Sequence, residues 1–286
     1  MAANSGRLAV ISTPIGNLGD LSPRAREELA AAELIAAEDT RRTGQLLTTL
    51  GLSRPLVSLH EHNEGERIGE LLQKLLAGAH IALVSDAGTP LLSDPGFELV
   101  RRVAQEGITI VAVPGASAIT AALSIAGLPT ERFTFEGFLP ARLAERRTRL
   151  AELAAETRTL VFFEAPHRIA ESLEDMSAAF GGERRAAVAR ELTKVFETVY
   201  RGTLTTLVAE ARSDANFTRG EITVVVAGAA PAAPCDRRDQ LDSTLTVLLG
   251  ELAPSKAAAL AARLTGAKRN EAYARALELS GQARGK

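Results

Sequence analysis

The chain has 286 residues, with 33 Lys and Arg against 35 Asp and Glu, a formal net charge of −2. A hydrophobic fraction of 46% supports packed cores and excludes a disordered chain, and the length suggests two domains. The single cysteine, Cys235, excludes an internal disulfide and a Cys-based zinc cluster, so we expect a reducing, cytoplasmic location and no metal. No apolar run approaches the ~18 residues of a membrane helix, so we expect no membrane contact.

The first half of the sequence alternates apolar strands with helical segments. Because Ser22 and Pro23 form a helix-start signal, the segment after them is predicted to be helical. In chain order we predict a strand at Leu8–Thr13, a helix at Ser22–Ala37, strands at Ile81–Ser85 and Ile108–Val113, and helices at Pro95–Gln105 and Ser117–Ala126. Continuous apolar strands between helices indicate a mostly parallel sheet that is covered on both faces.

The second half predicts another α/β domain, with a mixed sheet. We expect strands at Thr159–Phe163, Arg185–Arg190, Val195–Arg201 and Ile222–Ala227, with helices at Pro166–Phe180 and Thr205–Arg212. The loop after the Ile108 strand ends the first series of strand–helix units. We therefore divide the body into an N-terminal domain, 1–116, and a C-terminal domain, 117–228.

The end of the chain differs in composition from the body. Residues 229–235 contain two prolines and no periodicity, which predicts a linker. Residues 236–286 should form three short helices, at Gln240–Gly250, Ser255–Leu264 and Lys268–Leu279. This extension has nine basic and six acidic residues, a local charge of +3. Charge alone leaves a solvated helical surface and an RNA contact surface equally open.

Three loops follow the strands of the first half, and all three are rich in small residues. They are Pro14–Asp20, Ser85–Gly96 and Val113–Ile119. Ligands of parallel α/β sheets bind at the carboxyl ends of the strands, and small residues allow a ligand to approach the backbone closely. Asp86 adds an acceptor for hydroxyl or amino donors. We therefore predict a nucleoside-like cofactor at this edge.

Other familiar sites are poorly supported. Gly16 and Gly19 have the wrong spacing for the dinucleotide motif G-x-G-x-x-G, and no P-loop motif is present. The segment Gly115–Ile119 resembles a serine-hydrolase elbow, but Ile119 replaces its final glycine. A triad or metal site that combines Asp86 or Asp94 with His60, His62 or His167 remains a weak alternative because the spacing is unspecific.

Charged clusters supply candidates for phosphate binding and for proton transfer. Arg41 and Arg42 could bind phosphate, although surface ion pairing is the simpler interpretation of such clusters. Lys194 stands just before the strand predicted at Val195–Arg201, beside Glu191 and Glu197. Burial there would lower its pKa toward use as a general base, whereas a neighbouring carboxylate would favour its charged form, so a catalytic role and a structural ion pair remain equally open.

Eight segments form a combined pattern along the chain, and they are Ile11–Ser22, Ala37–Arg41, Val84–Pro90, Val113–Ser117, Phe135–Pro140, Phe163–Arg168, Glu191–Lys194 and Gly220–Thr223. Together they resemble the tetrapyrrole methylase-type (class III) methyltransferase family. Within it they are most similar to the subgroup that methylates a cytidine ribose of bacterial 16S ribosomal RNA. The resemblance covers residues 7–280, where the tail around Lys268–Leu277 is similar to that subgroup's helical extension.

The resemblance implies two α/β domains with S-adenosylmethionine in the cleft between them, and a homodimer. It also implies methyl transfer to the ribose 2'-hydroxyl of a cytidine in the decoding region, on free 16S rRNA or on the assembled small ribosomal subunit. The positions that match cofactor-binding motifs are Ile15, Asp86, Thr89, Ser117, Ala118, Glu164, Val195 and Glu221.

For the chemistry we expect Lys194 to assist removal of the proton, with Glu164 or Glu197 orienting it. RNA phosphates should be bound by local cations, which are Arg41, Arg42, Arg142, Arg146, Arg147, Lys268 and Arg269. Two alternatives remain. One is a methyltransferase of the same fold that acts on a tetrapyrrole, and the other is a noncatalytic RNA-binding protein.

Overall fold

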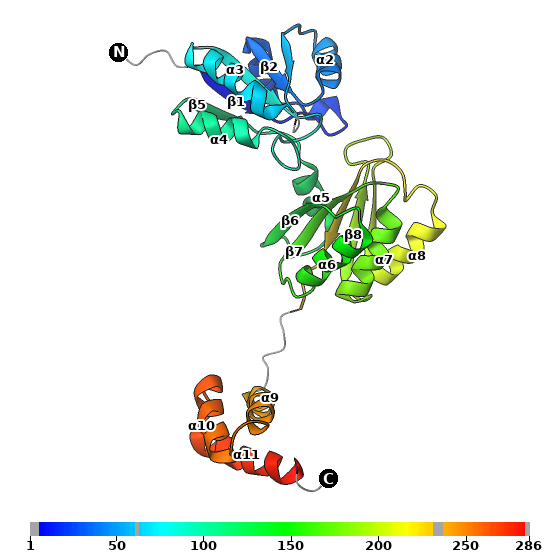
Figure 1. The fold of residues 1–286 in the computed structure, drawn as a ribbon. Coiled ribbons are helices and arrows are strands. Elements are labelled where there is room, and N and C mark those ends of the chain that lie inside the picture. Colours follow the sequence, from blue (N-terminus) through cyan, green and yellow to red (C-terminus); the bar gives the residue numbers. More distant parts are fainter. Residues whose placement is uncertain (1–5, 61–62, 231–236, 284–286) are drawn as a thin grey trace. The chain divides into compact units, whose positions relative to one another are not determined.

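The structure is a computed structural model that describes residues 6–60, 63–230 and 237–283 (Figure 1). The chain divides into two compact units, residues 1–228 and residues 229–286, which are described separately below. Cys235 and most of the linker predicted at 229–235 lie outside the described residues. None of the helices in the described ranges is long and apolar enough to cross a membrane.

The first unit begins with a parallel five-stranded sheet of strand order β3-β2-β4-β1-β5. Its elements are β1 (Arg7–Ile11), the short 3-10 helix Leu18–Asp20, α1 (Pro23–Ala31), β2 (Leu34–Ala37), α2 (Thr40–Thr49), β3 (Leu56–Ser58), α3 (Glu64–Leu76), β4 (His80–Val84), α4 (Phe97–Gln105) and β5 (Thr109–Val113). The sequence did not predict β2, α2, β3 or α3. Because all neighbouring strands run parallel, their carboxyl ends share one edge.

Side chains of this sheet alternate between two buried cores. Leu8 and Ile81 face a core with α3 and α4, whereas Ala9 and Ala82 face a core with α1 and α2. Each strand is therefore apolar on both faces, which is the pattern expected for a parallel sheet between two helical layers. The predicted α/β class with a covered parallel sheet is confirmed.

The helix predicted at Ser22–Ala37 is correct at its start and wrong at its end. Ser22 caps α1 by accepting a hydrogen bond from Ala25 N, and Pro23 is the first helical residue. The helix ends at Ala31, and Leu34–Ala37 form β2 between β3 and β4. A short run of Leu, Ile and Ala fits either state by periodicity, and pairing with β4 decides it here.

The second sheet is mixed, with strand order β6-β7-β10-β8-β9. Only β6 and β7 are parallel, and the pairs involving β10, β8 and β9 are antiparallel. Helices α6, α7 and α8 pack on one face, and α5 packs on the other. The elements are α5 (Ala118–Ala126), β6 (Phe133–Phe138), α6 (Leu143–Leu153), β7 (Thr159–Glu164), α7 (Ile169–Phe180), β8 (Arg185–Arg190), β9 (Thr198–Thr203), α8 (Leu204–Ser213) and β10 (Ile222–Val226).

The second unit contains the three helices that the sequence predicted. They are α9 (Arg237–Leu249), α10 (Pro254–Thr265) and α11 (Arg269–Ala283). A small core of leucines and alanines, which includes Leu241, Leu245 and Ala261, holds them together. Arg275 of α11 pairs with Asp242 of α9 through two hydrogen bonds of 2.7 Å. The unit therefore has its own core.

Candidate active site

The three small-residue loops contact one another at the carboxyl edge of the first sheet. Thr13 and Gly88 exchange backbone hydrogen bonds of 2.8 and 3.0 Å, which join the loops after β1 and β4. Thr89 Oγ1 donates to the carbonyl oxygen of Ala116 at 3.2 Å and lies 2.9 Å from Ser12 Oγ. These contacts hold the loops after β1, β4 and β5 in one continuous surface.

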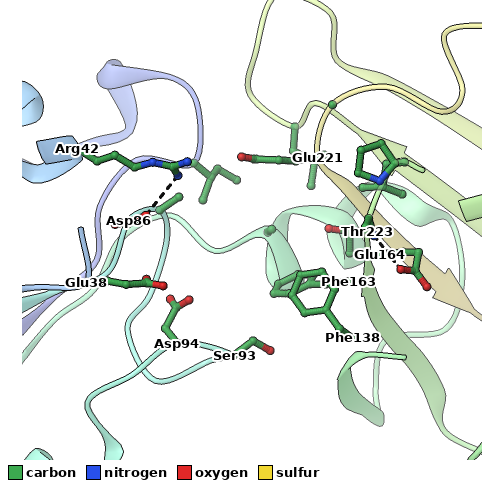
Figure 2. A pocket seen from close by; sticks show the side chains of 18 residues that line it. Glu38, Arg42, Asp86, Ser93, Asp94, Phe138, Phe163, Glu164, Glu221 and Thr223 are labelled. Carbon is green, nitrogen blue, oxygen red and sulfur yellow. Dashed lines mark hydrogen bonds and ion pairs between the residues drawn. The ribbon is translucent and has the colours of Figure 1, made fainter. Parts of the chain in front are cut away.

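A cavity of about 460 Å³ opens beside this surface and is closed on its other side by the second sheet (Figure 2). The ends of β6 and β7 and the start of β10 form that other side. The lining residues are Ile15, Glu38, Arg42, Asp86, Ala87, Ser93, Asp94, Ala118, Phe138, Phe163, Glu164, Ala165, Pro166, Leu192, Gly220, Glu221, Ile222 and Thr223. The volume is that of a site for a drug-sized ligand.

Part of the cavity wall is apolar. Ile15 lies in the loop after β1 and packs into the core that α5 forms with the second sheet. Phe138 and Phe163 meet edge to face, with ring centroids 5.7 Å apart and an interplanar angle of 61°. This wall offers flat apolar surface to an aromatic ring system.

The polar part of the wall is strongly acidic. Carboxylates come from Glu38, Asp86, Asp94, Glu164 and Glu221, and Arg42 is the one cation that lines the cavity within the described residues. Arg42 lies 3.3 Å from Asp86 Oδ2, and Asp86 Oδ1 accepts a hydrogen bond of 3.0 Å from Asp39 N. An excess of carboxylates favours a cationic ligand, because a positive charge reduces their mutual repulsion.

Asp94 differs electrostatically from the other cavity carboxylates. Burial raises its pKa from the ordinary 3.8 to about 6; the nearby Ser85 hydroxyl lowers it in part, and the charges of Glu38 and Asp86 raise it further. Figure 2 shows the carboxyl groups of Asp94 and Glu38 pointing toward each other. Like charges at close range favour the protonated form of one of them.

Glu164 is enclosed at the end of β7 and is fully engaged by its neighbours. Its oxygens accept hydrogen bonds from Ser172 Oγ at 2.6 Å and Ala165 N at 2.8 Å, and Arg168 Nε lies at 3.4 Å. The carboxylate therefore fixes the turn between β7 and α7. It shapes the cavity without offering a free proton acceptor.

The structure sorts the cofactor residues that the resemblance implied. Ile15, Asp86, Ala118, Glu164 and Glu221 line the cavity. Of the remaining three, Thr89 uses its hydroxyl to join two loops, and Ser117 precedes α5 without lining the cavity. Val195 is 93% exposed and does not line the cavity, so its contact with the cofactor stays a prediction.

Sequence reasoning named Asp94 only in the triad alternative and did not group Glu38, Ser93 and Asp94 with Asp86 as lining residues. The signal was present, since Glu38 ends one matching segment after a strand and Asp94 lies in the second small-residue loop. Only the parallel pairing of β2 with β4 shows that the two loops meet.

The structure decides between the two opposing effects on the pKa of Lys194. The predicted strand at Val195–Arg201 begins only at Thr198, so Lys194 lies in a loop. Its Nζ is 2.8 Å from Glu191 Oε1 and 3.2 Å from Glu221 Oε2. Burial alone would lower the pKa of Lys194, but the hydrogen bond to Glu191 and the charge of Glu221 together raise it. The two carboxylates therefore outweigh burial and stabilise the ammonium form.

The loop that holds Lys194 is fixed from both sides. A Cβ atom on Gly16 would lie 2.4 Å from Lys194 Cγ, so the loop after β1 packs directly on this side chain. Glu197, the other expected orienting carboxylate, instead accepts a hydrogen bond of 2.6 Å from Thr193 N and is exposed. Glu191 and Glu221 take the orienting role that the sequence assigned to Glu164 or Glu197.

The predicted RNA-binding arginines fall into two classes. Arg146 is buried, with its Nε 2.7 Å from Asp175 Oδ2, so the prediction that it contacts RNA phosphate is wrong. Arg147 binds the same carboxylate but remains 66% exposed. Exposed side chains are also found for Arg41, Arg42, Arg142, Lys268 and Arg269.

The alternative of a triad or metal site gains no geometric support. His62 lies outside the described residues. Among the residues that the structure does describe, no group of three or more His, Cys, Asp or Glu side chains is arranged to hold a metal ion. His60 and His167 do not line the cavity.

Comparison with known protein families identifies both units. Residues 7–208 match the family model of tetrapyrrole (corrin/porphyrin) methylases. Residues 236–280 match a model described as the RsmI C-terminal HTH domain. The two matched ranges fall on either side of the unit boundary at 228.

Curated relatives match nearly the whole chain. The "Ribosomal RNA small subunit methyltransferase I" of Xylella fastidiosa (strain Temecula1) is 52% identical over 94% of this chain and 98% of its own. The protein of the same name from Pseudomonas aeruginosa is 51% identical over 98% and 99%. Among solved structures, uroporphyrin-III-C-methyltransferase from Thermus thermophilus aligns with a TM-score of 0.55 at 21% identity, over 78% of this chain and 94% of that one, which supports the fold.

Proposed function

The chain belongs to the tetrapyrrole (corrin/porphyrin) methylase family, and on this basis we propose that it transfers a methyl group from S-adenosylmethionine to the 2'-hydroxyl of a cytidine in 16S ribosomal RNA. The names of its full-length relatives support ribosomal RNA of the small subunit as the substrate. The match of the C-terminal unit to the extension model supports it independently of the cavity.

The acidic cavity is the observation that carries the cofactor assignment. S-adenosylmethionine supplies an electrophilic methyl group on a positively charged sulfonium. Five carboxylates and one arginine line a space of about 460 Å³, and Phe138 and Phe163 add a flat apolar wall. A ligand that combines a purine ring with cationic groups fits both halves of this wall.

Seven of the eight predicted cofactor residues, all except Val195, then have a role that follows from their position. Ile15, Ala118 and the backbone around them provide close apolar contact, while Asp86 and Glu221 accept hydrogen bonds. Thr89, Ser117 and Glu164 act indirectly, because they hold the loops that form the wall. A reactant held in one orientation loses less entropy at the transition state, so such loops contribute to rate as well as affinity.

Lys194 is a positioning residue in this proposal. It remains protonated near neutral pH and binds Glu221, which lines the cavity, at 3.2 Å. A protonated lysine accepts no proton, so it holds Glu221 at the rim and leaves proton removal to another group.

The C-terminal unit is proposed to bind RNA. Lys268 and Arg269 are exposed at the start of α11, and Arg42, Arg142 and Arg147 supply further exposed cations on the body. Contacts of this kind orient RNA through its phosphates and carry little sequence information. We also propose a homodimer and a cytoplasmic location; sedimentation equilibrium tests the first of these.

The domain limits are part of the same proposal. We divide the body at 116/117 because α5 packs on the second sheet and not on the first. Residues 229–235 would be the linker, and 236–286 the RNA-contact extension.

The test is methyl transfer from labelled S-adenosylmethionine to unmethylated 16S RNA and to small subunits that contain it. After digestion to nucleosides, mass spectrometry should find 2'-O-methylcytidine. Label on a base would contradict the proposed 2'-hydroxyl acceptor. Label on an added porphyrinogen instead of RNA would favour the tetrapyrrole alternative. RNA binding without S-adenosylmethionine binding would favour the noncatalytic RNA-binding protein.

A further inference from the structure

The loop between β4 and α4 holds an unusual backbone conformation beside the cavity. Leu91 and Ser93 have φ angles of 73° and 69°, a backbone region that residues other than glycine rarely adopt. A Cβ atom on Gly137 of β6 would lie 3.2 Å from Ser93 Oγ, so the loop packs closely against the second sheet. Strained residues of this kind persist where the surrounding structure fixes them, and they cluster at functional sites.

This loop places Asp94 in the wall of the cavity, next to Ser93. Three of the other cavity carboxylates have nearby cations: Asp86 is paired with Arg42, Glu164 with Arg168, and Glu221 with Lys194. Asp94 forms no ion pair with any Lys, Arg or His in the described part of the chain. Its charged neighbours are Glu38 from the end of β2 and Asp86 from its own loop.

We propose that Asp94 is the general base of the reaction and that its carboxylate accepts the proton of the ribose 2'-hydroxyl. The inference rests on the proposed function. As the 2'-oxygen forms its bond to the methyl carbon, the carbon–sulfur bond breaks and its electron pair stays on sulfur. The hydroxyl proton moves to an oxygen of Asp94, and solvent later removes it.

The electrostatics of the cavity suit Asp94 to this task. Burial, with the charges of Glu38 and Asp86, raises its pKa to about 6. Asp94 is therefore ionised at pH 7 and more basic than an ordinary carboxylate, which is what proton abstraction near neutral pH requires. Lys194, whose pKa is raised, is protonated under the same conditions.

Two measurements test the assignment, and one of them needs no activity. In the full-length protein without cofactor, a carboxyl carbon resonance observed by NMR should titrate near pH 6 and be absent from Asp94→Asn. In single-turnover methylation at saturating S-adenosylmethionine, the wild-type rate should rise with pH to a plateau, with its midpoint at or below that of the cofactor-free protein because the sulfonium charge stabilises the carboxylate. Asp94→Asn should lose that rise and react about 10² to 10⁴ times more slowly at pH 8.

Matched variants separate a base from a structural residue. Glu106→Gln removes an exposed carboxylate at the C-terminal end of α4 that does not line the cavity, and it should leave both measurements unchanged. Glu38→Gln keeps Asp94 but removes a like charge beside it. The midpoint of the NMR titration and the midpoint of the rise of rate with pH should therefore both move to lower pH. This shift tests the assignment even if Asp94→Asn fails to fold.

The outcomes that overturn the inference are distinct from failure of the proposed function. The role of Asp94 alone would be overturned if Asp94→Asn methylated the wild-type RNA substrate at the normal rate and its rate still rose with pH as in the wild type. A loss confined to S-adenosylmethionine affinity in calorimetry would overturn it as well. A wild-type enzyme that methylates no ribose would overturn the proposed function, and this role with it.

Discussion

Arg146 and Arg147 bind the same carboxylate, yet their replacement should have very different effects on stability. Arg146 Nε lies 2.7 Å from Asp175 Oδ2, and both side chains are buried, at 3% and 5% exposure. Arg147 Nε lies 2.9 Å from Asp175 Oδ1, but 66% of its side chain is exposed. Asp175 thus pairs with one buried and one solvated guanidinium, and methionine at either position keeps most of the aliphatic volume.

The two burial states set the expected magnitudes. A hydrogen bond to a charged group contributes roughly 1.5–3 kcal/mol, and removal of one partner from a buried pair costs about 3–5 kcal/mol. In Arg146→Met, Asp175 still pairs with Arg147. We therefore expect the free energy of unfolding to fall by only about 2–3 kcal/mol, in the lower part of the combined range. Arg147→Met loses an exposed pair, worth roughly 0.2–1 kcal/mol. The melting temperature should therefore fall by about 4–12 °C in Arg146→Met and by at most about 4 °C in Arg147→Met.

Differential scanning calorimetry of the full-length variants measures this contrast, and RNA affinity measured at constant salt completes it. Arg147→Met should weaken RNA binding modestly, whereas folded Arg146→Met should bind RNA as the wild type does. Equal melting-temperature losses would refute the reasoning. So would an Arg146→Met protein of native stability with reduced RNA affinity, because Arg146 would then face RNA.

Three further expectations follow from the site. Asp86→Ala should lower the affinity for S-adenosylmethionine about 10- to 100-fold, since roughly 1.5–3 kcal/mol of hydrogen bonding to a charged acceptor is lost. Calorimetry measures this affinity, and an unchanged value in a folded variant would reject this role of Asp86. Deletion of 236–286 should keep cofactor affinity but reduce RNA affinity and its salt dependence, and equal salt slopes would count against it. Because the pKa of Asp94 rises from 3.8 to about 6 on folding, its stabilising contribution is full below pH 3.8 and is lost as pH rises through 6. Asp94→Asn should therefore melt higher than wild type at pH 8 but not at pH 4, and a pH-independent difference would exclude the shift.

Local patterns in the sequence were enough for the α/β class and for the shared edge of the sheet, although they did not reveal β2, α2, β3 or α3. Apolar strands between helices predicted the parallel sheet, and Ser22 with Pro23 marked the start of α1 correctly. The three small-residue loops were recognised as neighbours because parallel strands must end at the same edge of a sheet. The family resemblance added the cofactor and the substrate class, which periodicity and composition do not contain.

Only the tertiary structure decided which charged side chains are available for chemistry. Lys194 keeps its proton because Glu191 and Glu221 both bind it, and Glu221, which lies 3.2 Å away, is 27 positions distant in the chain. Arg146 is removed from RNA by Asp175, 29 positions away. Asp94 and Glu38 come from different loops and meet only because β2 pairs with β4. The charge state of a side chain depends on burial and on neighbours within a few ångströms, and folding selects those neighbours from distant parts of the sequence.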